Sequence, residues 1–336
     1  MMVDVHADQR DHVAKATAAD LLAGLGPVAP QARSVKFPTG YQPLDDVLNG
    51  GFRAQDLVLL GGRPGIGKTV AALQWARWMA MQGHTAIFVC YEHSPHSLLG
   101  RLLAMELGSL ARPDEIVELT RLRTIAQEVA LGALPATALT TDPLGEEAFH
   151  RLEEYGPRLH LVQGSGLRTG VVELAHIVSE HRSGPTALFV DYLQKIPMTG
   201  NTHGTEERTT HLAERLKELA MVVEVPVVAL AASDHEGLTS RRLRLHHLRG
   251  STALAHESDI ALLMNEKAVS ISKSHLAYDP VRAEQFKRWV VFSVEKNREG
   301  QPDMNLEFRK DLANYRFDPQ GGFVTESLVD AVLFEE

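Results

Sequence analysis

The segment Gly62–Thr69 constrains the fold of this chain more than any other feature. Its sequence, Gly-Arg-Pro-Gly-Ile-Gly-Lys-Thr, fits the pattern G-x-x-x-x-G-K-[ST] of a phosphate-binding loop. A buried-strand pattern precedes it at 56–60, and a helical pattern follows it at 70–76. Glycines let successive backbone N–H groups face a phosphate, and the positive end of the helix points at the same anion. The alternative is a glycine-rich turn with an accidental lysine, but strand before and helix after favour nucleotide binding.

A run of consecutive residues is expected to bind the nucleotide. Lys68 would reach the β- and γ-phosphates, and the Thr69 hydroxyl would hold Mg²⁺. The whole run consists of Gly62, Arg63, Pro64, Gly65, Ile66, Gly67, Lys68, Thr69 and Val70.

Two acidic residues at predicted strand ends fit the same site. The apolar strand 188–191 ends in Asp191, where a carboxylate can hold Mg²⁺ through water, although aspartate is also a common turn residue. Glu92 closes the strand 86–91, just before the helix-start pair Ser94-Pro95. If that strand neighbours the one that feeds the loop, Glu92 faces the γ-phosphate and can activate the attacking water. The alternative for Glu92 is an acid stabilised near a helix N-terminus.

Composition limits the other possibilities. The chain has 336 residues, 44% hydrophobic, and a formal net charge of −9, so any nucleic-acid contact must be confined to a local patch. Its one cysteine, Cys90, excludes an internal disulfide, fits a reducing cytoplasm and is expected to be a buried structural thiol. No apolar run is long enough to span a bilayer, and the first ten residues do not read as a secretory signal. The histidines show no recognised metal-binding spacing.

Strands and helices alternate from Ser34 onward, which predicts an α/β fold with a mostly parallel central sheet flanked by helices. The expected strands are 56–61, 86–91, 159–163, 186–191, 226–231, 259–264 and 288–296. The expected helices are 69–82, 96–107, 145–155, 169–182 and 206–223, and residues 111–131 also look helical. We divide the chain into an N-terminal extension (1–32) with a short amphipathic helix near 11–25 or a disordered tail, an ATPase domain (33–316) and an acidic tail (317–336).

Two basic clusters lie late in the chain. Lys296 and Arg298 are two residues apart at a strand end, so they project together. Spacing alone favours a solvated strand end for this pair. The segment 241–249 carries four arginines in nine residues, Arg241, Arg242, Arg244 and Arg249. Phosphate contact needs local cations of this kind, and the alternative is a solvated charged loop.

From about Phe37 to Phe317, the chain resembles the C-terminal motor domain of DnaB-type replicative helicases, within the RecA-like superfamily of P-loop NTPases. The resemblance is carried by the entry segment 37–45, the phosphate loop with its Arg-Pro pair, Tyr91-Glu92-His93-Ser94, and Lys296-x-Arg298-x-Gly300. The tetrapeptide Asp191-Tyr192-Leu193-Gln194 is its most specific part and argues against a recombinase-like or clock-protein-like branch.

The resemblance implies a ring of six subunits in the cytoplasm, with ATP and Mg²⁺ between neighbours and single-stranded DNA in the central channel. It assigns Glu92 to water activation, and Lys296 and Arg298 to the neighbouring subunit's site. It also makes the loop after Gln194, the arginines of 241–249 and Ser251 candidates for DNA contact. The implied function is an ATP-dependent DNA helicase or translocase of DNA replication.

Three departures from the family pattern keep an alternative open. Ala231-Ala232 replaces the usual Ser-Gln pair, Arg249-Gly250-Ser251 replaces Arg-Glu-Ser, and the N-terminal collar domain is not seen; residues 120–145 also look like an insertion. The alternative function is a DnaB-like ATPase that acts as a protein-assembly switch or scaffold without unwinding, with protein partners. The ATPase rate with and without single-stranded DNA discriminates between the two.

Overall fold

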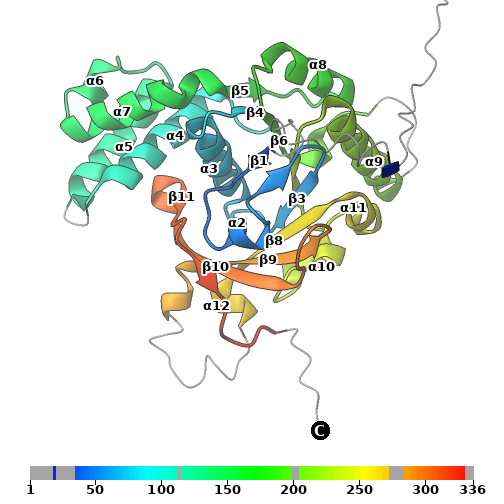
Figure 1. Ribbon diagram of the computed structural model, residues 1–336. Coiled ribbons are helices and arrows are strands. Elements are labelled where there is room, and N and C mark those ends of the chain that lie inside the picture. Colours follow the sequence, from blue (N-terminus) through cyan, green and yellow to red (C-terminus); the bar gives the residue numbers. More distant parts are fainter. Residues whose placement is uncertain (1–17, 20–34, 113–114, 199–203, 272–283, 330–336) are drawn as a thin grey trace, which may run out of the picture.

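The computed structural model describes residues 18–19, 35–112, 115–198, 204–271 and 284–329 of the chain. Their centre is a 10-stranded mixed sheet (Figure 1). Six strands run parallel in the order β8 (Ile260–Glu266), β3 (Leu57–Gly62), β7 (Val227–Ala232), β6 (Thr186–Asp191), β4 (Thr85–Cys90) and β5 (Leu159–Gln163). Beyond β8 the sheet continues antiparallel with β9 (Trp289–Asn297) and β10 (Met304–Asp311), and β11 (Arg316–Phe317) and β12 (Gly322–Phe323) both pair with β10.

The central strands are apolar along their whole length because helices cover both faces of the sheet. Val58 and Leu60 of β3 point into one core, which includes α3 (Lys68–Met81). Leu57 and Leu59 point into the opposite core, with α8 (Val171–His181), α9 (Thr205–Val223) and α11 (Ser251–Glu257). This arrangement brings the carboxyl ends of the parallel strands to one edge, where ligands of open α/β sheets bind.

A separate helical layer lies beside the sheet, at the left of Figure 1. It comprises α4 (Pro95–Leu110), α5 (Ile116–Ala130), α6 (Thr137–Thr140) and α7 (Pro143–Tyr155). Leu103, Leu122 and Leu139 belong to its own apolar core. The Ser94 side chain caps α4 and Pro95 occupies its first turn, as the sequence predicts. The segment 120–145, which the sequence marks as an insertion, therefore folds as helices that pack on α4.

Short elements connect these layers. They are β1 (Lys36–Phe37), α2 (Leu44–Val47), β2 (Phe52–Arg53), η2 (Gly156–Arg158), η3 (Leu193–Lys195), α10 (His235–Thr239), η4 (Leu245–His247), α12 (Lys267–Ser270) and η5 (Leu312–Asn314).

The predicted fold class is confirmed, and each strand and helix expected by range is present with ends that differ by at most three residues, except that the helix expected over 111–131 begins five residues later, at Ile116. Strand β10 was not predicted. The predicted domain boundary at 316/317 falls inside β11, and Leu328 is buried against Ile271, so the folded domain extends into the segment assigned to an acidic tail. The helix expected near 11–25 lies outside the described residues, apart from Ala18 and Ala19.

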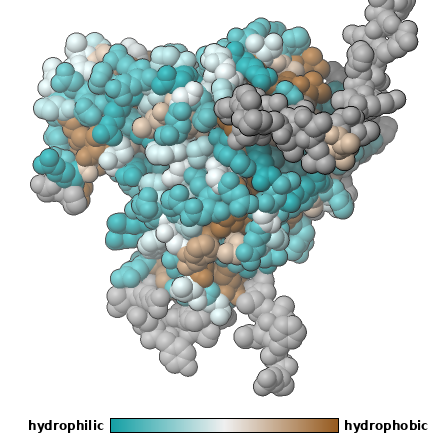
Figure 2. Space-filling view, in the orientation of Figure 1, coloured by the Kyte–Doolittle hydropathy of each residue, from teal (hydrophilic) through white to brown (hydrophobic). Residues whose placement is uncertain are grey.

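The face of the molecule in Figure 2 is mostly hydrophilic, with apolar side chains gathered in small separate patches. Among the described residues, no helix combines the length and apolar character that a bilayer crossing requires.

Candidate nucleotide-binding site

The phosphate loop connects the end of β3 to the start of α3. Gly65 and Gly67 have φ of +79° and +102°, values that favour glycine. At Gly67 a Cβ atom would also lie 2.7 Å from the Phe317 ring, so β11 packs directly under the loop. These two glycines let the loop curl ahead of the helix, which is the backbone shape that directs N–H groups at an anion.

Lys68 crosses this loop. Its Nζ donates to the carbonyl oxygens of Gly62 (2.6 Å) and Arg63 (3.1 Å). Burial lowers the pKa of Lys68 to about 8, and Asp191 and Glu92 oppose this shift. A half-buried ammonium that donates to backbone carbonyls gains from a phosphate at the same place, since opposite charge favours its protonated form.

Thr69 and Asp191 meet where α3 faces β6. The Thr69 hydroxyl donates to Asp191 Oδ2 at 2.8 Å, and the Cys90 thiol lies 3.5 Å from the same oxygen. Burial raises the pKa of the Asp191 carboxyl, and hydrogen bonds from Thr69 and Cys90 oppose that shift. Cys90 is buried, and burial raises the pKa of its thiol to about 12, in agreement with a structural rather than a nucleophilic role. The hydroxyl and carboxylate oxygens are the ligand type that Mg²⁺ prefers.

Glu92 reaches the site by a different route from the one the sequence suggested. Its strand, β4, is not next to β3, because β7 and β6 lie between them. Glu92 nevertheless lines the same cavity as Lys68, Thr69 and Asp191. The condition that β4 lies next to β3 is therefore not met. The carboxyl ends of β4 and β6 are adjacent, however, and they bring Glu92 and Asp191 to the same cavity.

This cavity has a volume of about 430 Å³ and includes residues that the sequence did not indicate. Arg101 of α4 contacts His93 (Nη2–Nε2 2.9 Å) and lies over the Tyr315 ring. The cavity is lined by Pro64, Gly65, Gly67, Lys68, Thr69, Val70, Glu92, His93, Arg101, Asp191, Tyr192, Ala232, Leu312 and Tyr315. Helix α4 and the β10–β11 connection thus form one wall, and no local sequence pattern links these two segments.

Lys296 and Arg298 lie away from this cavity. The Lys296 ammonium donates to the carbonyls of Ala255 and His256 (2.6 and 3.0 Å), and Arg298 donates to the His256 carbonyl (2.7 Å). The shared His256 acceptor shows that the two side chains project to the same side. Arg298 also pairs with Asp259 at 3.1 Å, and its side chain is 48% exposed. Arg298 therefore presents its cation on the surface with the half-buried Lys296 beside it, and neither residue lines the cavity of its own chain.

The four arginines of 241–249 have different environments. Arg242 is 6% exposed and donates to Asn305 Oδ1 (2.7 Å) and Ser293 Oγ (3.1 Å), so a DNA phosphate cannot reach it; its assignment to DNA contact was wrong. Arg244 pairs with Glu295, and Arg241 donates to the Ile271 carbonyl (3.0 Å). Only Arg249 among the four is exposed. Ser251 is the first residue of α11.

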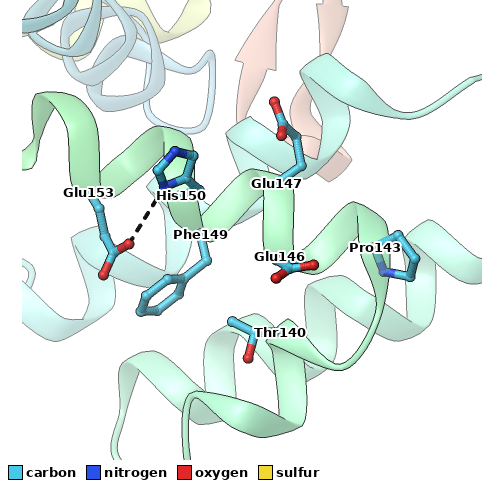
Figure 3. Close-up of a pocket in the computed structure, with 7 residues that line it drawn as sticks. All are labelled: Thr140, Pro143, Glu146, Glu147, Phe149, His150 and Glu153. Carbon is cyan, nitrogen blue, oxygen red and sulfur yellow. Dashed lines mark ion pairs between the residues drawn. The ribbon is translucent and has the colours of Figure 1, made fainter.

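A second cavity, of about 560 Å³, lies on α6 and α7 (Figure 3). Its lining is acidic and consists of Thr140, Pro143, Glu146, Glu147, Phe149, His150 and Glu153, with His150 and Glu153 3.9 Å apart. Carboxylates repel a triphosphate, and no cluster of three or more His, Cys, Asp or Glu residues within the described ranges could hold a metal ion at this cavity instead. The loop cavity is therefore the better nucleotide site.

The sheet order and the loop define a RecA-like, phosphate-loop nucleotide-binding domain. A family model described as DnaB-like helicase C terminal domain matches residues 37–317, so the chain belongs to that family.

Known proteins agree with this assignment. The chain is 29% identical over 270 residues to the replicative DNA helicase DnaB of Rickettsia bellii (76% of this chain, 50% of the relative) and 26% identical over 233 residues to that of Geobacillus stearothermophilus (68% and 46%). It thus spans about half the length of these relatives. Among solved structures, it resembles the ATPase domain of G40P (TM-score 0.66, 18% identity, 85% of this chain, 92% of that chain) and a KaiC-like protein of Pyrococcus horikoshii (TM-score 0.53, 13% identity, 84% and 97%). Both likenesses show the fold.

Proposed function

We propose that this domain is an ATPase that binds MgATP in the loop cavity and hydrolyses it at subunit interfaces. The observation that carries the proposal is the convergence of Lys68, Thr69, Asp191 and Glu92 on one cavity, from three separate chain segments. Lys68 supplies a cation for the phosphates, and Thr69 and Asp191 supply oxygen ligands for Mg²⁺. Bound Mg²⁺ would neutralise charge on the phosphate oxygens. The exposed Glu92 carboxylate would take a proton from the attacking water.

The proposed site is completed by a second copy of the chain. Lys296 and Arg298 do not line their own cavity; Arg298 is exposed, Lys296 is half-buried, and the two project together. Across an interface, such a pair would stabilise charge that develops on the γ-phosphate. A head-to-tail interface of this kind closes into a ring when its rotation allows, and a ring of six subunits is the arrangement that we propose.

The motor would act on single-stranded DNA in the central channel, as a DNA helicase or translocase of DNA replication. Arg249 is the exposed cation that best suits backbone contact, with Arg241, Arg244 and Ser251 beside it in the chain. Protein partners fit the same proposal. One solved structure of similar fold is a DnaB-like replicative helicase described together with its interactions with primase.

ATP hydrolysis by the purified protein, measured at low salt with and without a single-stranded oligonucleotide, tests the proposal. We expect hydrolysis that DNA stimulates, and a loss on the order of 100-fold in Lys68→Ala because the phosphate cation is removed. Lys287→Ala is the matched control, since this lysine is exposed and pairs with Glu284 of its own segment. Hydrolysis without stimulation by DNA would favour the switch or scaffold function, and no hydrolysis would contradict both.

A further inference from the structure

Ala232, at the carboxyl end of β7, contacts both the nucleotide cavity and the arginine-bearing segment 233–249. Ala232 lines the cavity. Its N–H donates to Oε1 of Gln194 at 3.1 Å, and its carbonyl accepts from the N–H of Arg249 at 3.2 Å. Gln194 lies in η3, three residues after Asp191. The backbone of one residue therefore joins the segment that follows the proposed Mg²⁺ ligand to the exposed arginine.

Three buried polar atoms around this strand end have no hydrogen-bond partner in the described part of the chain. They are Nε2 of Gln194, Oγ of Ser233 and Nη2 of Arg63. Gly62 pairs with Ala232 in the β3–β7 register, so Arg63 and Ser233 leave the sheet side by side. Arg63 Nε donates to the Gly237 carbonyl at 2.9 Å, which ties the phosphate loop to α10. Buried donors without acceptors are rare in folded proteins and require an explanation.

The segment beyond β7 is held by the same strand end. Asp234 N–H donates to the His247 carbonyl at 2.9 Å, and Ser233 forms a bridge with Leu248. A Cβ atom on Gly237 would lie 2.8 Å from Leu243 and 2.9 Å from His247, so α10 packs tightly on this segment. A displacement at Ala232 or Gly237 would therefore move the whole segment rather than one side chain.

We propose that Gln194 is a positioning residue that couples the nucleotide cavity to the segment 233–249. In the described conformation its amide accepts from Ala232, and its donor has no acceptor. When nucleotide engages Lys68 and Asp191, η3 shifts with the end of β6, the Gln194 donor finds an acceptor, and Ala232 and Arg249 move with it. Unmet donors make a second arrangement accessible, because that arrangement satisfies groups that the first leaves without a partner. This inference rests on the proposed nucleotide site.

Amide hydrogen exchange of the full chain, with and without a non-hydrolysable ATP analogue and Mg²⁺, tests the coupling. In the parent we expect slower exchange in the loop 62–70 and a change of at least about twofold in 233–249. Gln194→Glu keeps the side-chain size and an acceptor for Ala232 but removes the donor. Its nucleotide-free exchange should match the parent, and the response of 233–249 should be lost. Gln194→Ala should already exchange faster in 233–249 without nucleotide.

Lys195→Ala, the exposed neighbour in η3, is the control and should respond like the parent. In all variants, slowed exchange in 62–70 shows that nucleotide still binds. Binding without any response of 233–249 in the parent, or an unchanged response in Gln194→Glu, overturns the coupling and leaves the proposed site standing. Absence of slowing in the parent's loop overturns the proposed nucleotide site, and the coupling with it.

Discussion

At the scale of single residues, Asp56 is a buried carboxylate outside the cavity. It precedes β3, is 9% exposed and accepts from the N–H of Arg53 at 2.8 Å. Burial raises its pKa to about 6, with a smaller contribution from Asp259. Because the folded-state pKa lies above the unfolded value, the folded chain binds more protons between about pH 4 and 6, and the unfolding free energy falls as pH rises through this window.

Asp56→Asn removes this titration and keeps an oxygen that can accept from Arg53. We expect the variant to gain stability relative to the parent as pH rises from 4 to 7, by about 1–2 kcal/mol after allowance for residual exposure. Denaturant unfolding at several pH values measures the difference. Asp46→Asn, at an exposed site, is the control for the loss of one negative charge. A difference independent of pH for Asp56→Asn would show that burial does not control this group.

The site residues divide by whether local sequence carries their signal. Lys68, Thr69 and Asp191 could be predicted because a loop pattern and an apolar strand ending in acid are local features. Arg101 and Tyr315 could not, because α4 and the β10–β11 connection meet only through tertiary packing. Arg242 was misassigned for a related reason: a run of arginines in sequence does not show which of them is buried.

At the scale of elements, a buried ion pair joins α3, α4 and α7. Arg77 Nη2 donates to Glu106 Oε2 at 2.6 Å, and the Tyr155 hydroxyl donates to Oε1 at 2.8 Å. Glu106 is 0% exposed and Arg77 is 8% exposed. Such a pair connects the helical layer to the helix that follows the phosphate loop, and its energetic value depends on both partners being present.

Glu106→Ala should lower the apparent unfolding free energy by about 3–5 kcal/mol, because it leaves the Arg77 guanidinium buried without a carboxylate. The double variant Arg77→Met/Glu106→Leu should be more stable than Glu106→Ala, since it removes both charges and keeps side-chain volume. Denaturant unfolding of the parent, Glu106→Ala and the double variant measures these unfolding free energies. A double variant less stable than Glu106→Ala would mean that the pair itself, rather than the cost of an unpaired charge, dominates.

Strands that are buried on both faces could be predicted from the sequence, whereas a half-exposed strand could not. β3, β4 and β6 are continuous apolar runs, so their ranges could be predicted from composition alone. β10 carries Glu307, Arg309 and Lys310 among its apolar residues, and this mixed pattern hid it. The short helices α10 and α12 depend on contacts from distant segments and have too few residues to show a period.

At the scale of the whole molecule, the cations and the cavity are separated on one chain. Glu92, Lys68 and Asp191 share the cavity, whereas Arg298 is held at α11 by His256 and Asp259. A monomer therefore presents half of the proposed hydrolytic site on each of two surfaces. Two copies placed head to tail would bring the halves together, and this geometry makes the assembly testable through activity.

Lys68→Ala and Arg298→Ala should each lose most of the ATPase activity, the first in its own cavity and the second in a neighbour's. When the two inactive proteins are mixed and allowed to exchange subunits, an intact site forms wherever an Arg298→Ala cavity faces the intact Arg298 of a Lys68→Ala subunit. With random assembly, about one quarter of the interfaces are intact, so activity should return to roughly that fraction of the parent value. A mixture of Lys68→Ala with Glu92→Ala, both altered in the same cavity, should stay inactive. If the first mixture also stays inactive although mass measurement shows mixed oligomers, or if Arg298→Ala alone hydrolyses ATP at the parent rate, the site is not shared between subunits.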